Sequence, residues 1–186
     1  MKKTIIIIAV VAIVALIIGG ILLSGNKQTS GIKLETAEDM VALIEKIYTQ
    51  TEMPLQSLQT AEIDISDEMM LQSFTGLSSN KDIKTLVVSE PMMTSQAYSL
   101  VMVKATENAD VEAMKQEMVD NINTRKWICV SAEKLYATNS GDIIFLVMSS
   151  EQLAKPVYEA FKKEAGEIGK ELQKSEEVVE IPDDIL

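Results

Sequence analysis

Three stretches of the chain place apolar residues at helical spacing. The first follows a capping-box pattern that begins at Thr36, and it predicts a helix over residues 37–50. The second predicts a helix over residues 110–126. The third predicts a helix from about Glu151 or Pro156 to Lys174, and a start near Lys155 is favoured because Pro156 suits only a first turn.

Four other stretches are rich in β-branched and apolar residues, which predicts strands. Between the last two, Asn139 and Gly141 suit the positive φ angles of a tight reversal, so we expect these two strands to form a hairpin. Weaker strand candidates cover residues 62–65 and 70–75. The four clearer strands are predicted at residues 85–89, 97–104, 128–137 and 142–149.

The order of these elements predicts an α+β domain over residues 35–175. Hairpins give antiparallel strand pairs, and amphipathic helices need an apolar surface to cover. The economical arrangement is one antiparallel sheet with helices packed on one face, a two-layer sandwich. Residues 176–186 follow as an acidic tail, whose Val-Val-x-Ile pattern also suits an edge strand.

An uninterrupted apolar run precedes the domain. Residues 5–23 are nineteen consecutive Ile, Val, Ala, Leu and Gly residues. At ~1.5 Å per residue a helix of that length reaches ~28 Å, close to the ~30 Å hydrocarbon core of a bilayer. We therefore predict an N-terminal transmembrane helix within residues 1–23. Lys2 and Lys3 place the N-terminus inside, so the domain lies outside the cytoplasmic membrane on a flexible spacer of residues 24–34.

A cleaved signal peptide is the alternative interpretation of the same run. Signal peptides have apolar regions of about 7 to 15 residues that end at a small-x-small site. The run in this chain is longer and has no clean Ala-x-Ala pattern after it. This favours an uncleaved single-pass anchor over a cleaved, secreted form.

Composition narrows the classes of function. The 186 residues carry a formal charge of −11, with no histidine and one cysteine. Nucleic-acid binding is disfavoured, because phosphates attract Lys and Arg. Without histidine the chain lacks the usual near-neutral acid–base group and imidazole metal ligands, and a lone cysteine forms no intramolecular disulfide. We therefore predict a protein that is not an enzyme and that holds no cofactor or metal.

Two patterns suggest chemistry but have simpler explanations. Ser131 and Lys134 match the SxxK pattern of penicillin-recognising enzymes, but no SDN or KTG motif accompanies them and they fall at a predicted strand. Asp64, Asp67 and Glu68 form the tightest carboxylate cluster before the tail, yet they lack the spacing and the glycine of a calcium loop. No catalytic, cofactor-binding or metal-binding residue is predicted.

Cysteine and paired methionines are predicted to pack inside the domain. Cys129 lies in an apolar segment, where a free cysteine behaves as a small hydrophobe. The pairs Met69-Met70 and Met92-Met93 place one side chain on each face of a strand, which favours core filling over an adaptable binding surface.

Three segments within residues 83–163 have a recognisable pattern: SLVMVKATENADVEAMKQEMVDNINTRK, YATNSGDIIFLVMSS and YEAFKK. They resemble a family of uncharacterised bacterial envelope proteins known only as a domain of unknown function. In that family a signal or lipoprotein anchor precedes a domain with the same order of strand, helix, hairpin and helix. This chain departs from the lipoproteins because no cysteine follows its apolar run closely enough to carry a lipid. The resemblance implies an envelope location, and it implies no site residues because the family has no established activity.

Together these observations predict a non-enzymatic binding or interaction domain at the bacterial cell envelope. Its partner is expected to be an envelope protein, a peptide or a cell-wall component, held at an edge strand or in a helix groove. Two alternatives stay open. One is an envelope hydrolase that uses carboxylates or the pair Ser131 and Lys134, and the other is a structural subunit of an envelope complex.

Overall fold

The computed structural model describes residues 31–55 and 57–176. Along this part of the chain, single strands or pairs of consecutive strands separate the helices, and a longer loop of residues 122–133 joins the fourth strand to the helix before it. The elements are α2 (Ala37–Gln50), β1 (Leu58–Glu62), α3 (Glu68–Thr75), β2 (Ile83–Pro91), β3 (Ser99–Ala105), α4 (Val111–Asn121), β4 (Lys134–Ser140), β5 (Ile143–Ser149), α5 (Glu151–Ala165) and β6 (Leu172–Ser175).

The six strands form one sheet in the order β1-β2-β3-β5-β4-β6. Every pair of neighbours is antiparallel, which confirms the predicted α+β class and its antiparallel sheet. The predicted hairpin of β4 and β5 is present, with Gly141 at a φ of 58° in the turn. Strands β1 and β6 are the two edges of the sheet.

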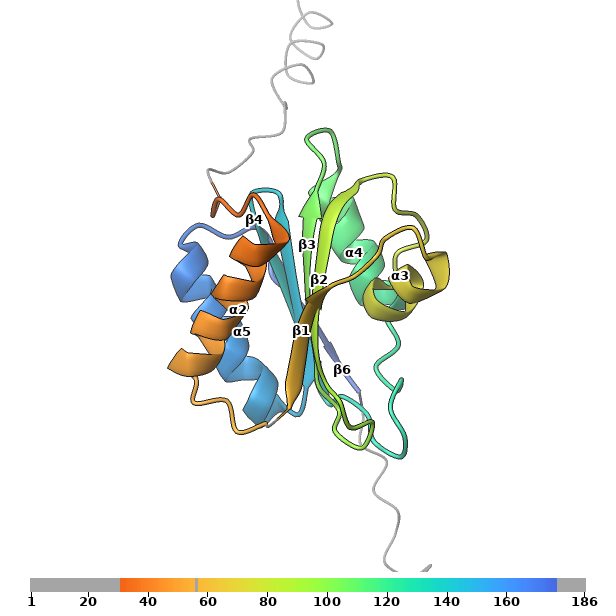
Figure 1. Cartoon of the computed structure of the whole chain (residues 1–186), viewed down its shortest axis with the longest axis vertical. Coiled ribbons are helices and arrows are strands. Elements are labelled where there is room, and N and C mark those ends of the chain that lie inside the picture. The colour runs from red at the N-terminus through yellow and green to blue at the C-terminus, as the bar shows by residue number, and fades with distance from the viewer. Residues whose placement is uncertain (1–30, 56, 177–186) are drawn as a thin grey trace, which may run out of the picture.

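Helices cover both faces of the sheet, so the prediction that they pack on one face was wrong. Figure 1 shows the sheet edge-on, with α2 and α5 on one side and α3 and α4 on the other. Each face has its own cluster of buried apolar residues. The molecule therefore has three layers instead of the two of a sandwich.

The central strands explain the third layer. In β3, Leu100 and Met102 join the cluster under α2 and α5, while Val101 and Val103 join the cluster under α4. Every residue of β3 and of β5 is buried. A strand that is apolar on both sides needs cover on both faces.

Local capping and turn signals correct two predicted elements. The strand predicted at residues 70–75 is part of α3, because the Asp67 side chain accepts from the Met70 N–H and Gly76 adopts the left-handed conformation that ends a helix. Helix α4 ends at Asn121, five residues before the predicted 126. The next residues form a turn in which Asn123 Oδ1 accepts from the Arg125 N–H at 2.9 Å.

Helix α5 starts before the favoured Lys155 and ends earlier than predicted. It begins at Glu151 and carries Pro156 on its exposed side, where water can hydrate the carbonyl that loses its helical partner. It ends at Gly166, whose φ of 70° and ψ of −82° leave helical geometry. Residues 172–175, predicted as helix, form β6 and pair with β4.

The described residues give no support to the predicted transmembrane helix, and this part of the fold prediction is corrected. No helix within residues 31–55 and 57–176 is long and apolar enough to cross a bilayer. The apolar run of residues 1–23 and most of the spacer lie outside the described residues, as does the tail from residue 177. The location predicted from that run stays a prediction.

Candidate functional site

A groove lies between helix α2 and the end of edge strand β1. It is a hollow of about 280 Å³. Three small apolar side chains and three glutamates line it, all but one of them from α2. We name this hollow the α2–β1 groove; its residues are Ala37, Glu38, Val41, Ala42, Glu45 and Glu62.

Strand β1 presents unpaired backbone groups beside this groove. The Ile63 N–H donates to the Leu86 carbonyl at 2.9 Å, which shows that odd-numbered residues face β2. Because residues of an antiparallel strand alternate between inward and outward backbone groups, Leu58, Thr60 and Glu62 direct theirs away from the sheet. These outward groups bond to no other described residue. The edge is thus open to a further strand.

The three glutamates of the groove are free of partners within the described part of the chain. Glu38, Glu45 and Glu62 are exposed, and no side-chain hydrogen bond or ion pair joins any of them to another described residue. Carboxylates beside apolar surface attract a group that has a cation at its tip and an apolar stem. The groove therefore has a defined charge preference as well as a shape.

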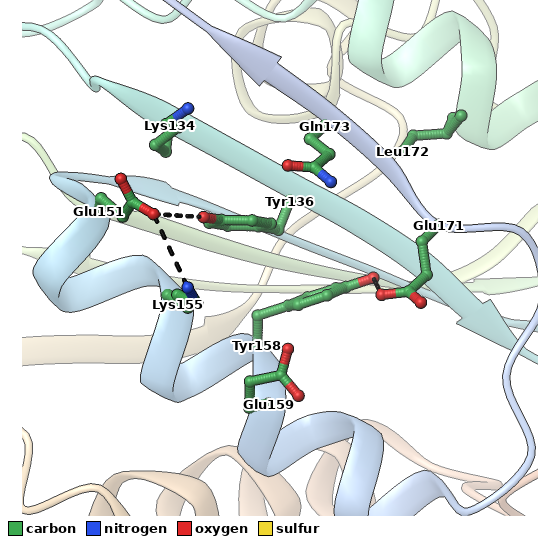
Figure 2. Close-up of a pocket in the computed structure, with 9 residues that line it drawn as sticks. All are labelled: Lys134, Tyr136, Glu151, Lys155, Tyr158, Glu159, Glu171, Leu172 and Gln173. Atoms are coloured by element: carbon green, nitrogen blue, oxygen red, sulfur yellow. Dashed lines mark hydrogen bonds and ion pairs between the residues drawn. The ribbon is translucent and has the colours of Figure 1, made fainter.

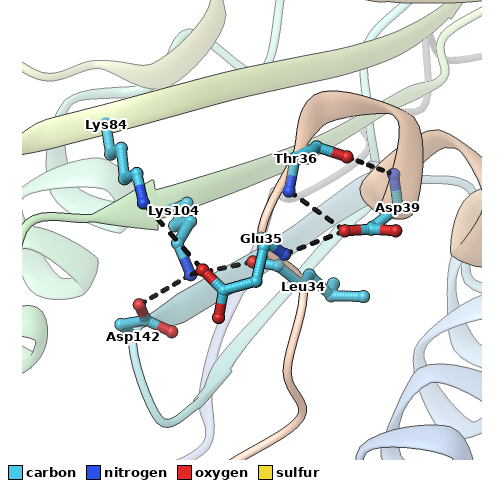
Figure 3. A network of polar contacts seen from close by, with 7 residues as sticks. All are labelled: Leu34, Glu35, Thr36, Asp39, Lys84, Lys104 and Asp142. Carbon is cyan, nitrogen blue, oxygen red and sulfur yellow. Dashed lines mark hydrogen bonds and ion pairs between the residues drawn. The ribbon is translucent and has the colours of Figure 1, made fainter.

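A buried lysine fixes the start of α2 and with it one end of the groove. Lys104 Nζ donates to the Leu34 carbonyl at 2.8 Å and pairs with Asp142 at 3.0 Å and with Glu35 at 3.7 Å. Figure 3 shows this network reaching the first turn of α2, where Thr36 forms the predicted capping box. The segment before α2 is thereby attached to the central strand β3.

The first turn of α2 is also held by its own carboxylate. Asp39 Oδ2 accepts from the N–H groups of Glu35 and Thr36 at 3.0 and 3.1 Å. These bonds, led by the one from Glu35, hold the pKa of Asp39 below its usual value. This carboxylate is consequently occupied at the cap, unlike that of neighbouring Glu38.

A chain of hydroxyl groups fixes α2 against β1 and β2. Tyr48 of α2 donates to Ser89 Oγ at 2.8 Å, and Thr60 of β1 donates to the same oxygen at 2.8 Å. The buried Tyr98 hydroxyl donates to Tyr48 at 3.1 Å. Burial raises the pKa of Tyr48 to about 12 and that of Tyr98 well above its usual value, so both stay protonated donors. These bonds therefore fix the C-terminal part of α2, where Tyr48 lies, relative to β1.

A second hollow, of about 220 Å³, lies between α5 and the other edge of the sheet. Figure 2 shows Tyr136 of β4 and Tyr158 of α5 at its base, with charged side chains around them. The two rings stack at 5.1 Å between centroids, and both are almost fully buried. The tyrosines therefore contribute little surface to a ligand.

Charged groups of this second hollow are held by contacts to neighbouring parts of the fold. Glu171 accepts from the Tyr158 hydroxyl and from Lys162, each at 3.0 Å. The Lys162 ammonium lowers the pKa of Glu171. Burial first, and then the bond to Glu171, raise the pKa of Tyr158. Lys134 donates to Ser175 Oγ at 2.6 Å. These contacts tie β6 to α5 and β4, which is a structural role, so we take the α2–β1 groove as the candidate site.

The serine and lysine considered for catalysis are not brought together by a described contact. Ser131 lies exposed in the loop before β4. The Lys134 ammonium binds Ser175 of β6 instead. The activation of a serine by this lysine has no support in the described geometry.

The carboxylate cluster at the start of α3 serves the backbone. Asp64 accepts from the Ser66 N–H at 2.9 Å, and Asp67 caps α3. Glu68 lies in the first turn of the helix, where the dipole favours a negative charge. Among the described residues, no three acidic or cysteine side chains are grouped to hold a metal ion.

The predicted burial of Cys129 and of the methionine pairs was wrong. Cys129 is exposed in the loop before β4, at a φ of 59°. Met69, Met92 and Met93 expose more than half of their surface, and Met70 is also exposed. The pairs lie in α3 and in the β2–β3 loop, so alternation along a strand does not apply to them.

Sequence reasoning missed the α2–β1 groove, although one signal for it was present. Val41 and Ala42 interrupt the polar side of α2 with apolar residues, between the carboxylates of Glu38 and Glu45. The position of β1 beside them follows from the sheet order, which the sequence of a single chain does not reveal.

Comparison with known proteins gives no family assignment. No protein-family model matches the chain, and neither a curated protein nor a solved structure shows a significant match. The class of the protein is therefore defined by its fold, a three-layer α+β domain over the described residues. The resemblance to envelope proteins stays a prediction.

Proposed function

We propose that the domain is a non-enzymatic binding module that holds an extended peptide segment of a partner protein. The segment would add as a strand to the outer edge of β1 and lay alternate side chains into the α2–β1 groove. The observation that carries this proposal is the open backbone edge of Leu58, Thr60 and Glu62 beside an apolar hollow. In this mode of recognition, backbone bonds give affinity and side-chain pockets give specificity.

Edge β1 suits this role better than edge β6. Strand β6 has only four residues, and Lys174 and the nearby Lys134 place ammonium groups at that edge. Short strands and lysines are the usual means by which proteins block pairing at an edge. In the second hollow, Glu151 and Glu171 also pair with lysines of α5, whereas the glutamates of the α2–β1 groove have no partner among the described residues.

The chemistry of the groove supports binding over catalysis. Its lining supplies carboxylates and apolar groups, without a hydroxyl, thiol or amine nucleophile, and the whole chain has no histidine to act as a near-neutral base.

The test is selection of binders to the full-length chain from a displayed library of random heptapeptides, followed by NMR titration. Selected peptides are expected to shift the amide signals of residues 58–62 and of α2. Thr60→Pro removes an outward N–H without touching the bonds to β2. It is expected to weaken binding by at least about tenfold, the equivalent of one lost backbone bond at ~1.4 kcal/mol.

Two matched variants control for side effects of the proline. Thr60→Val removes the hydroxyl that bonds Ser89 but keeps the N–H, and Gln173→Pro makes the same change on the other edge. Both should retain binding. Selected peptides whose affinity is equal for Thr60→Pro and the unmodified chain would refute strand addition at β1.

A further inference from the structure

We infer that the segment held on β1 carries lysine or arginine at alternate positions, on the side that faces α2. This inference rests on the proposed strand addition and names the chemistry of the partner. Every strand added at β1 points half of its side chains toward α2, because side chains alternate between the faces of a sheet. The α2–β1 groove receives that half.

The groove matches the two parts of a long cationic side chain. Ala37, Val41 and Ala42 supply apolar surface for the methylene stem. Glu38 and Glu45 supply carboxylates for the charged tip, with Glu62 between the helix and the incoming strand. Lysine and arginine bury the stem and keep the charge at a polar rim, which is the arrangement that this lining favours.

The spacing of the carboxylates fits two successive side chains of a strand. Glu38 and Glu45 are seven residues apart on α2, which corresponds to about 10.5 Å along the helix axis. Side chains on one face of a strand recur every about 6.8 Å. Two adjacent cationic side chains therefore fit within the reach of the two helical carboxylates, and Glu62 lies at the strand side.

Two lysines of the described residues that lie near these carboxylates are paired with other glutamates. Lys46, the residue after Glu45, pairs with Glu164 of α5 at 2.6 Å. Lys84 pairs with Glu35 at 3.9 Å. Acidic segments are repelled by three uncompensated carboxylates and by a chain of net charge −11. The groove thus selects for cations and against anions.

Three defined peptides test the inference on the full-length chain. Each peptide has seven residues and is blocked at both ends, and all three share the same Thr or Val residues at five positions. They differ only at the third and fifth positions, which are both Lys in the first peptide, both Gln in the second and both Glu in the third. The Lys peptide is expected to bind about tenfold more tightly than the Gln peptide at low salt. This factor corresponds to the summed free energy of a few exposed ion pairs. This advantage should shrink when ionic strength rises to about 0.3 M, because exposed pairs are screened.

Two double variants with the same change in charge test whether the preference for the Lys peptide arises in the groove. Glu38→Gln with Glu45→Gln removes the helical carboxylates and leaves β1 unchanged. Glu68→Gln with Glu107→Gln removes the same charge from exposed positions outside the groove. The first variant should lose the preference for Lys over Gln while it still binds the Gln peptide. The control variant should keep the preference.

The outcomes separate the two proposals. Equal affinity of the Lys and Gln peptides, with shifts at residues 58–62 for both, overturns the charge inference and leaves strand addition standing. Peptides that shift no β1 amide overturn strand addition itself. A preference for Lys that survives Glu38→Gln with Glu45→Gln places the cation elsewhere and also overturns the inference.

Discussion

Lys104 shows how one residue fixes the approach of the chain to the sheet. Its ammonium lies almost fully buried between the Leu34 carbonyl and the Asp142 carboxylate. Lys104→Met keeps the stem but leaves both acceptors without their donor, so we expect a loss of about 2 kcal/mol in the free energy of unfolding, measured by urea titration.

The exposed Lys84 provides the control for this change. Its pair with Glu35 is long, at 3.9 Å, and both side chains are exposed, so Lys84→Met should alter stability by less than about 0.5 kcal/mol. Equal stability of the two variants would show that the buried network does not hold the segment before α2.

Cys129 gives a chemical test of a loop that sequence reasoning took for a buried strand. The residue is exposed and has a positive φ. Its thiol should therefore react completely with a disulfide reagent such as DTNB in the native protein, without denaturant. A thiol that reacts only in urea would place Cys129 inside the fold.

Helices α2 and α5 are joined by one carboxylate that responds to pH. Glu164 accepts from Lys46 Nζ and Gln50 Nε2, each at 2.6 Å. The bond from Lys46, followed by that from Gln50, lowers the pKa of Glu164 below its usual 4.5. A carboxyl group whose pKa is lower in the folded state stabilises the fold above its unfolded pKa, and this contribution is lost as pH falls through the folded pKa.

We therefore expect the stability difference between the unmodified chain and Glu164→Gln to be constant near neutral pH and to close below pH 4.5. Urea titrations at several pH values measure it. Glu107→Gln, at an exposed turn position with no charged partner among the described residues, should show no such closing of the stability difference. If the stability difference between the unmodified chain and Glu164→Gln is unchanged at low pH, the charge of Glu164 does not contribute to stability.

The end of α5 depends on a single glycine. Gly166 has a φ of 70° and nothing within 4 Å of an added Cβ. Gly166→Ala therefore tests backbone strain alone and should cost about 1–2 kcal/mol in thermal or urea unfolding. An alanine variant as stable as the parent would indicate that the chain leaves α5 by a different route.

Elements whose signals are local were predictable from the sequence, and those set by tertiary contacts were not. The capping box at Thr36 and the turn at Gly141 place α2 and the reversal between β4 and β5 where they were expected, although β4 begins at Lys134 and not at the predicted residue 128. The apolar stripe of residues 155–174 continued through Gly166, so periodicity alone extended α5 and hid β6. Leu172 follows the helical spacing but is used by a strand.

The candidate site was less predictable than the fold. Nothing in the sequence around Glu62 indicates that it lies next to Glu38 and Glu45. That proximity requires the strand order, which places β1 at an edge, and the hydroxyl chain from Tyr48 to Thr60. Both are long-range features that hydrophobic patterns along one chain do not report.

At the scale of the whole molecule, one sheet is shared by two apolar clusters. Phe161 is fully buried on the α5 side and stacks on Phe145 at 4.1 Å between ring centroids, while Met118 is fully buried on the α4 side. Because β3 and β5 contribute to both clusters, a cavity-forming substitution in either cluster should lower the stability of the entire domain.

Phe161→Ala is expected to cost about 3–5 kcal/mol and Met118→Ala about 2–5 kcal/mol. For each variant, Trp127 fluorescence, which reports the α4 side, and far-UV circular dichroism should give one coincident transition. Two separate transitions would show that the layers unfold independently.

The position of β6 determines how the fold would respond to mechanical force. The described chain begins at one end of the sheet and ends at the other, past β6 (Figure 1). Strand β6 pairs with β4 from Leu172 opposite Ala137 to Ser175 opposite Lys134. Tension between residues 31 and 176 pulls β6 along its own axis, so its ladder bonds are loaded in shear and must break together instead of peeling open one by one.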